Sequence, residues 1–156
     1  MISYEEALKK AAAYCAKHET CTFDLKRKLL QWKIPEQFHE KIIHYLTENQ
    51  FIDNLRYTHS FVNDKFFINH WGRIKIRYAL HQKNIDDNII DRVFDEIITE
   101  EKYLDTLRDI LHKKLKTLKE NDRNRLKTKL INFALQRGFE KDLAFQISDE
   151  LLKETE

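Results

Sequence analysis

Glycine and proline are scarce in this sequence of 156 residues, which holds 2 glycines and 1 proline. β-Sandwiches and barrels need many tight turns, so this scarcity disfavours them. The two glycines, Gly72 and Gly138, lie far apart in the sequence, and no Gly-x-Gly pair exists to form a glycine-rich phosphate loop. Aromatic residues make up 12% of the chain, which a disordered protein would lack. We therefore expect a mostly helical globular protein.

Cysteine is equally scarce, with Cys15 and Cys21 alone. The chain opens on polar residues and no secretory signal is evident, so we expect a cytoplasmic protein with reduced thiols. Cys15, His18 and Cys21 offer three zinc ligands at spacings that match no common zinc finger, so we expect no metal site. The apolar runs are too short and too charged to span a bilayer, and we expect no membrane association.

Signatures of catalysis are also missing. The histidines are scattered without a His-Glu-x-x-His pattern, and Ser60 and Ser148 lack a nucleophile-elbow context. Carboxylate pairs such as Asp86 and Asp87 fall at predicted helix starts, where they stabilise the helix dipole. The sequence therefore predicts a protein that is not an enzyme and needs no cofactor.

Charge is balanced overall, at +2, but it is segregated near the carboxyl end. Between residues 112 and 129 there are 8 basic residues against 2 acidic ones, and between 140 and 156 there are 6 acidic residues against 2 basic ones. Such a dipolar surface suits orientation on a charged partner. The basic cluster is our main candidate for contact with a partner or nucleic acid: Lys113, Lys114, Lys116, Lys119, Arg123, Arg125, Lys127 and Lys129.

Internal similarity is the most informative feature that is present. Three segments that begin at Leu25, Ile76 and Leu130 align without gaps, at offsets of 51 and 54 residues. Apolar residues coincide through the alignment, and a glutamine recurs three places before the apolar residue of each turn. Asn84 and Gly138 stand at equivalent turns, where both residue types accept a left-handed backbone. The chain is therefore predicted to be built from three copies of one unit.

Each unit is predicted to contain three helices. We place the helix-turn-helix-like units at residues 1–52, 53–102 and 103–156, in an all-α, elongated and curved array. Ser3 with Glu6, and Asp53, are expected to cap first helices. Pro35 suits the first position of a third helix. The expected helices include 23–33 in the first unit and 103–120, 124–137 and 141–153 in the third.

The aromatic residues have two interpretations. Phe66, Phe67, Trp71, Tyr78 and Phe94 could stack bases of a single strand, but at helical spacing we expect them to lie mainly in the core. Trp32 precedes a turn, and it could face a partner or fill the seam between units. On the second helix of unit two, exposed cations could meet phosphates or form a solvated face: Arg73, Lys75, Arg77 and Lys83.

The second unit carries a specific motif. It runs Phe51-Ile-Asp-Asn-x-Arg56-Tyr57, then Trp71-Gly72-x-x-x-Ile76-Arg77-x-x-Leu80-x-x-Lys83-Asn84-Ile85. This pattern resembles the signature of the RecX family, regulators of the RecA recombinase. Stretches of the first and third units resemble the family too, in the same order. The sequence departs from the pattern where Ala79 replaces a usual Glu and Asn84 replaces a usual Gly.

The resemblance implies a regulator of recombination, DNA repair and the SOS response. Such proteins are understood to bind RecA and its filaments on single-stranded DNA, to lodge along the filament groove, and to inhibit recombinase, ATPase and coprotease activity. We expect a monomer, with weak direct DNA binding possible. The alternative is an autonomous DNA-binding protein of tandem helix-turn-helix-like units. A sequence pI of 8.4 favours the first hypothesis, because strongly DNA-binding domains usually exceed 9.

Overall fold

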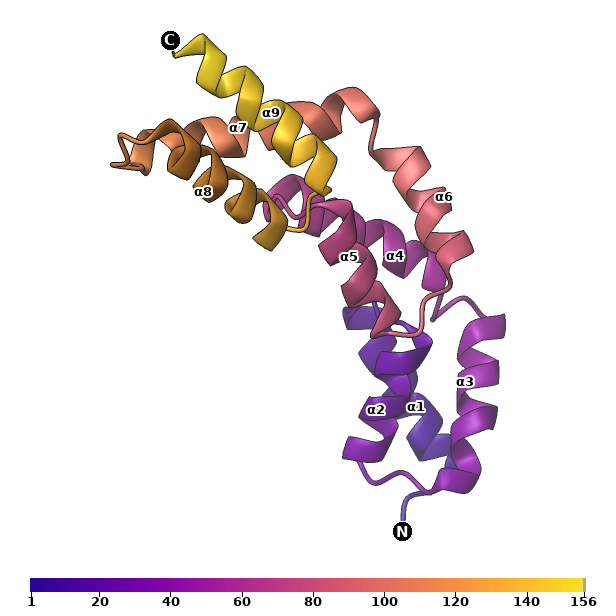
Figure 1. Cartoon of the computed structure of the whole chain (residues 1–156). Coiled ribbons are helices and arrows are strands. Elements are labelled where there is room, and N and C mark those ends of the chain that lie inside the picture. Colours follow the sequence, from indigo (N-terminus) through magenta and orange to yellow (C-terminus); the bar gives the residue numbers. More distant parts are fainter. Residues whose placement is uncertain (156) are drawn as a thin grey trace.

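The structure, a computed structural model, describes residues 1–155 as an all-helical chain without strands. A 3₁₀ turn, Glu36–Phe38, precedes α3, and a π-helical turn, Asp64–Ile68, follows α4. Figure 1 shows the helices in an elongated, bent array, which confirms the predicted fold class. The nine α-helices of this range are α1 (Tyr4–Lys17), α2 (Thr22–Gln31), α3 (His39–Glu48), α4 (Asn54–Asn63), α5 (Arg73–His81), α6 (Asp87–Ile97), α7 (Glu100–Thr117), α8 (Arg123–Gln136) and α9 (Lys141–Glu154).

Each unit begins with a side-chain cap on its first helix. The Ser3 hydroxyl accepts a hydrogen bond from the backbone N–H of Glu6 at 3.1 Å, and Asp53 caps α4 in the same manner. Thr99 caps α7, so this helix begins at Glu100 and ends at Thr117, three residues ahead of the expected 103–120. The expectation for Pro35 was also inaccurate: Pro35 precedes the 3₁₀ turn, and α3 starts only at His39.

The turn after each second helix has the same geometry in all three units. Lys33, Asn84 and Gly138 adopt positive φ angles of 58°, 57° and 95°. The next residue of each turn donates its backbone N–H to a carbonyl five residues earlier, as Ile85 does to Leu80 at 3.1 Å. This 6→1 bond is the closure of a Schellman motif. The sequence alignment of the units therefore corresponds to one repeated backbone structure.

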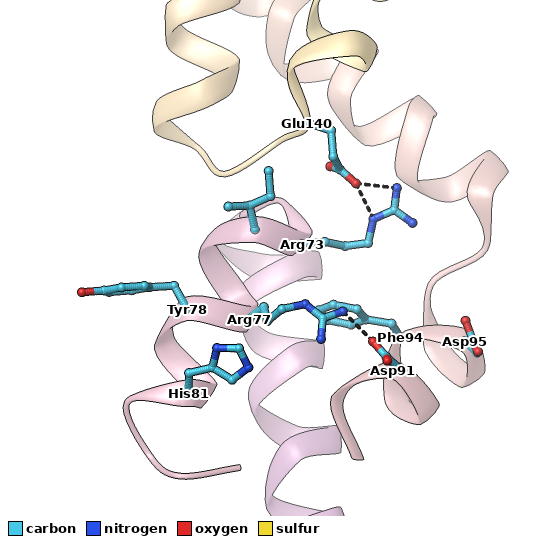
Figure 2. Close-up of a pocket in the computed structure, with 9 residues that line it drawn as sticks. Arg73, Arg77, Tyr78, His81, Asp91, Phe94, Asp95 and Glu140 are labelled. Atoms are coloured by element: carbon cyan, nitrogen blue, oxygen red, sulfur yellow. Dashed lines mark hydrogen bonds and ion pairs between the residues drawn. The ribbon is translucent and has the colours of Figure 1, made fainter. Parts of the chain in front are cut away.

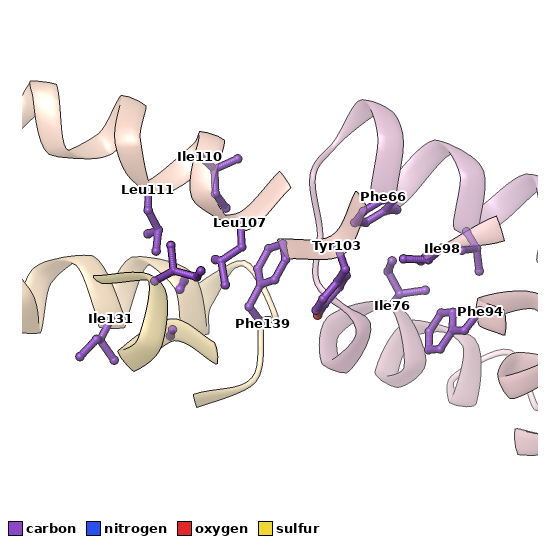
Figure 3. Packing of buried hydrophobic residues seen from close by; sticks show 14 of the residues in the cluster. Phe66, Ile76, Phe94, Ile98, Tyr103, Leu107, Ile110, Leu111, Ile131 and Phe139 are labelled. Atoms are coloured by element: carbon purple, nitrogen blue, oxygen red, sulfur yellow. The ribbon is translucent and has the colours of Figure 1, made fainter. Parts of the chain in front are cut away.

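Two separate cores stabilise the array. The first unit buries its own cluster, which includes Leu25, Leu29 and Ile42. The second and third units share a larger cluster, in which the Tyr103 ring lies 5.8 Å from the Phe66 ring and 5.0 Å from the Phe139 ring, between centroids. Figure 3 shows Tyr103 between the two units. Because one core serves both, the second and third units are joined by apolar packing.

The two glycines of the chain meet at this junction. The Gly72 N–H donates to the Arg137 carbonyl at 2.7 Å, and the Ile74 N–H donates to the Gly138 carbonyl at 3.0 Å. A Cβ at Gly72 would overlap the Gly138 carbonyl, and a Cβ at Gly138 would overlap the Cβ of Lys75. Glycine is required at both positions because the backbones approach too closely for any side chain.

The joint between the first and second units is mainly polar. Lys83, in the turn after α5, binds Asp24 of α2 at 2.7 Å, and Arg56 of α4 binds Glu19 at 2.8 Å. The Asn54 side chain accepts from the backbone N–H of Thr22 at 3.1 Å. The larger core reaches across this joint at Cys21, and Phe23 packs against it there. The first unit is therefore attached more weakly than the third.

Gly138→Asn tests whether the turn of the third unit requires glycine. Asn84 adopts a φ of 57° at the equivalent turn, but Gly138 has a φ of 95°, where a side chain is strained, and its Cβ would also overlap Lys75. We expect the variant to lower the free energy of unfolding by about 2 kcal/mol or more, in the range of an overpacked interior. Urea denaturation measures this change.

Asn84→Gly is the matched control, since it makes the reverse change at a turn where asparagine is accommodated. It should alter stability by less than about 1 kcal/mol. Equal, small effects at both positions would show that the two glycine backbones are not held against each other.

Candidate partner-binding surface

The second helices of the three units share one side of the molecule. In Figure 1, α2, α5 and α8 lie on the inner side of the bend. The recurring glutamines, Gln31, Gln82 and Gln136, end or follow these helices and are exposed in all three units. Ile74 and Tyr78 of α5 are also exposed, at 55% and 68%. The exposed residues of these three helices and of their ends therefore include apolar groups together with amides able to hydrogen-bond.

Tyr78 corrects part of the expectation for the aromatic residues. Phe66 and Phe94 are buried as expected, but Tyr78 is exposed and Phe67 is exposed at the end of the π-helical turn. Ile76 and Leu80 face the core, and a residue midway between them points to the opposite side of a helix. Trp32 does not fill the seam between units: it is half-buried and packs on the first unit's core beside Tyr14.

A depression of about 640 Å³ lies beside α5 and is lined by residues of α5, α6 and Glu140. Figure 2 shows Arg77 across it, directed at Asp91. The Arg77 guanidinium pairs with Asp87 at 2.7 Å and Asp91 at 2.5 Å, and lies 5.3 Å from the centre of the Phe94 ring. Its charge is thus neutralised within the second unit.

Arg73 has a structural position at the junction. It binds Glu140 at 2.8 Å and Glu100 at 3.4 Å, and its guanidinium lies 3.9 Å from the centre of the Tyr103 ring. The Tyr103 hydroxyl donates to Glu140 and accepts from the backbone N–H of Arg73. Burial, followed by the hydrogen bond to Glu140, raises the pKa of Tyr103 well above its usual range. Arg73 therefore joins the second unit to the third.

The other two candidate cations also contact neighbours. Lys83 was expected on the second helix, but α5 ends at His81, so Lys83 lies in the turn that follows, where it pairs with Asp24 across the first joint. Lys75 lies 4.4 Å from the centre of the Trp71 ring and pairs with no carboxylate in residues 1–155. Lys75 is therefore the one member of this set that keeps an uncompensated charge within the described chain.

The basic cluster of the third unit surrounds the connection between α7 and α8, at one tip of the array (Figure 1). Several members pair locally: Lys113 with Asp109 at 3.0 Å, Lys129 with Glu120 at 3.4 Å, and Lys127 with Asp149 at 2.6 Å. Lys127 by a hydrogen bond, and Lys153 and Arg123 by charge, hold the pKa of Asp149 below its usual range. The acidic α9 therefore neutralises part of the cluster.

Three cations remain at the tip. Lys116, Lys119 and Arg125 are exposed, and no carboxylate within residues 1–155 pairs with their side chains. Lys114 is half-buried and lies 5.0 Å from the centre of the Phe133 ring. These four residues of the sequence-predicted cluster pair with no carboxylate of residues 1–155.

Metal and thiol chemistry finds no support in the described chain. Residues 1–155 contain no group of three or more His, Cys, Asp or Glu side chains placed to hold a metal ion. Cys15 and Cys21 are free thiols, and burial raises the pKa of both. A raised pKa lowers the thiolate fraction and hence nucleophilicity. Within that same range, every helix is too short or too polar to cross a membrane.

The fold and surface define a class of protein: a tandem array of three-helix units with a charged surface. Family models for RecX match the chain twice, as the second three-helix domain over residues 53–93 and the third three-helix domain over residues 100–147. The chain belongs to the RecX family of regulatory proteins. Members of this family are regulators and not enzymes, which confirms the prediction that the chain is not an enzyme.

Similarity to individual proteins extends over most of the chain. Regulatory protein RecX of Clostridium acetobutylicum is 27% identical over 155 residues, which are 97% of this chain and 72% of that protein. Regulatory protein RecX of Finegoldia magna is 31% identical over 122 residues, 78% of this chain and 60% of the relative. That of Staphylococcus aureus is 28% identical over 95% of this chain and 54% of its own length. The chain thus spans little more than half of the last two relatives.

Solved structures share the fold. The crystal structure of RecX from Lactobacillus salivarius superposes with a TM-score of 0.84 at 22% identity, over 95% of this chain and 96% of that one. A second crystal structure of regulatory protein RecX gives a TM-score of 0.82 at 24% identity, over 94% of this chain and 73% of that one. At these identities the match establishes the three-dimensional fold.

Sequence reasoning missed the internal pairing of the α5 cations and the exposure of Ile74 and Tyr78. A signal for Arg77 was present, since Asp87 and Asp91 stand four residues apart on the following helix and can reach one guanidinium together. No local pattern pointed to Glu140 as the partner of Arg73, because that pairing crosses 67 residues of sequence.

Tyr103→Phe tests the polar part of the junction. The change keeps the stacked ring but removes the hydroxyl that serves Arg73 and Glu140. We expect a loss of about 1–3 kcal/mol in unfolding free energy, because a buried N–H and a carboxylate lose their partner. Thermal or urea unfolding followed by circular dichroism measures it.

Tyr78→Phe supplies the control, since its hydroxyl is on an exposed residue with no recorded hydrogen bond. Its effect should remain within about 0.5 kcal/mol. If both variants matched the parent, the Tyr103 hydroxyl would contribute nothing to the junction.

Proposed function

We propose that this chain binds the RecA recombinase filament on single-stranded DNA and inhibits its strand exchange, ATPase and coprotease activity. Membership of the RecX family implies RecA as the partner. The observation that carries the proposal is the bent array itself, which presents the second helices of all three units on one inner side (Figure 1). An elongated inner face suits a long, regular partner such as a filament better than a small ligand.

The charges support contact with an anionic partner at specific places. Lys116, Lys119 and Arg125 at the tip are exposed and uncompensated within residues 1–155. The inner face adds the apolar Ile74 and Tyr78, which give an interface short-range packing. In this arrangement the charged tip steers the encounter, and the inner face supplies contacts that do not depend on salt.

The alternative function, autonomous sequence reading by helix-turn-helix-like units, is less well supported. A recognition helix needs free side chains to reach base edges in the major groove. Arg73 and Arg77 of α5, and Lys83 in the turn after it, are engaged by carboxylates of this same chain. Residues 1–155 therefore offer no arginine on α5 that is available for bidentate contact with guanine.

The test measures RecA ATPase and strand exchange on single-stranded DNA with the triple variant Lys116→Glu, Lys119→Glu, Arg125→Glu. All three side chains are exposed, so the helical signal should persist. At low salt, inhibition should require at least about ten-fold more protein, and the difference from the parent should shrink as salt rises.

A matched control, Lys9→Glu, Lys17→Glu, Lys141→Glu, makes the same change in net charge at exposed sites away from the tip. It should inhibit nearly as well as the parent. If both triple variants inhibit RecA equally weakly, the loss of inhibition comes from net charge and not from the tip. If the parent protein leaves RecA activity unchanged, the proposed function is wrong.

A further inference from the structure

A cluster of cations and aromatic rings lies beside the glycine junction, and three of its members, Trp71, Lys75 and Lys114, belong to the sequence-predicted sets. It contains two rings, each contacted by two cations. Lys65 and Lys75 place their ammonium groups 4.7 and 4.4 Å from the centre of the Trp71 ring. We call the whole set the junction patch: Lys65, Trp71, Lys75, Lys114, Phe133 and Arg137.

The second ring repeats this arrangement on the neighbouring unit. Lys114 of α7 lies 5.0 Å from the centre of the Phe133 ring, and the Arg137 guanidinium lies 5.6 Å from it. The Arg137 carbonyl accepts the N–H of Gly72, the residue after Trp71, at 2.7 Å. A backbone hydrogen bond thus joins the segment that carries Trp71 to the residue that contacts the Phe133 ring, so the two ring-and-cation groups flank the junction of the two units.

The cations of the junction patch are not neutralised by the described chain. Within residues 1–155 no carboxylate pairs with Lys65, Lys75, Lys114 or Arg137, in contrast to the paired Arg73, Arg77 and Lys83. The Arg137 Nε–H is buried and lacks an acceptor in this range. All six side chains are half-buried, so they are partly accessible and partly held in place. Fixed, uncompensated cations favour a bound polyanion.

We propose that the junction patch is a binding site for single-stranded nucleic acid. A strand offers a phosphate and an aromatic base at every nucleotide, and the patch offers ammonium or guanidinium groups beside aromatic rings in two consecutive groups. An acidic peptide would use the cations but leave the rings without a matching partner. A duplex keeps its bases stacked inside, so only a single strand can bring bases to Trp71 and Phe133.

This inference goes beyond the proposed function, because it requires no recombinase. It also differs from the helix-turn-helix alternative, since the site lies at the junction of two units and not on a recognition helix. The contacts are to phosphates and base faces, so the site should show little sequence preference and strong dependence on salt.

The experiment uses the full chain carrying Trp32→Phe, which leaves Trp71 as the sole tryptophan of the 2 in the sequence. Titration with a thymidine 20-mer in about 50 mM salt should quench Trp71 fluorescence saturably, and affinity should fall as salt rises. A duplex of equal length should bind at least about five-fold more weakly, because it cannot stack on the rings. Absence of quenching at low salt would overturn the proposal.

Lys65→Gln with Lys75→Gln, added to that background, should weaken binding about ten-fold or more. It should also reduce the slope of log affinity against log salt by about 1.4, which corresponds to two phosphate contacts on a single strand. The matched control, Lys9→Gln with Lys17→Gln, removes two exposed cations from α1 and should change affinity by less than about two-fold. Circular dichroism checks that both double variants keep the parent's helical signal.

Three further outcomes would contradict the assignment: equal weakening by the two double variants, duplex binding as tight as single-strand binding, and displacement of the 20-mer by polyglutamate at equal charge concentration. RecA inhibition by the same variants is recorded separately. A double variant that no longer binds the oligonucleotide but still inhibits RecA would support the junction patch as a nucleic-acid site. This outcome does not depend on whether the proposed filament function is correct.

Discussion

The close contact between Gly72 and Gly138 is the constraint on which the rest of the array depends. Two backbone hydrogen bonds, from Gly72 and Ile74, cross from the second unit to the turn of the third. Such bonds are possible only if neither glycine carries a Cβ. Once the backbones meet, Tyr103 stacks between Phe66 and Phe139 and a single core covers both units.

The two joints of the array are physically different, and this difference bears on how the protein meets a long partner. Apolar packing and buried polar contacts fix the second unit to the third, so the tip cations and the junction patch keep a constant geometry. The half-buried pair Lys83–Asp24 and the more exposed pair Arg56–Glu19 hold the first unit, together with the apolar contact at Cys21 and Phe23. We therefore expect the first unit to separate from the other two before they separate from each other.

The sequence was sufficient for the repeat and its secondary structure, because these depend on local patterns. Apolar spacing located the helices, and Asn84 and Gly138 marked equivalent left-handed turns. The predicted helix ends were less accurate. Pro35 was predicted at the first position of the third helix, but a 3₁₀ turn lies between Pro35 and α3. The candidate surface depended on contacts remote in sequence. Arg73, Arg77 and Lys83 are neutralised by Glu140, Asp91 and Asp24, respectively. The helical pattern of the sequence contains no information about which carboxylates will be near these cations.

The glycines illustrate the same limit. Their scarcity suggested an all-helical chain, and their separation excluded a phosphate loop, yet neither observation indicated that they touch. The position of Lys75 depends on that contact. Lys75 lies against Gly138, and its ammonium lies beside Trp71, next to the third unit. Tertiary structure thus turns a solvated helix face, as the sequence presents it, into a fixed cationic and aromatic surface.

Native-state hydrogen exchange tests the central claim, that the second and third units form one cooperative body through the glycine contact. The amides of Gly72 and Ile74 should exchange with the same opening free energy as the core amides of α7 and α8, while α1 to α3 open separately at a lower free energy. Exchange of Gly72 and Ile74 well before α7 and α8, or a single opening event for all three units, would contradict the account.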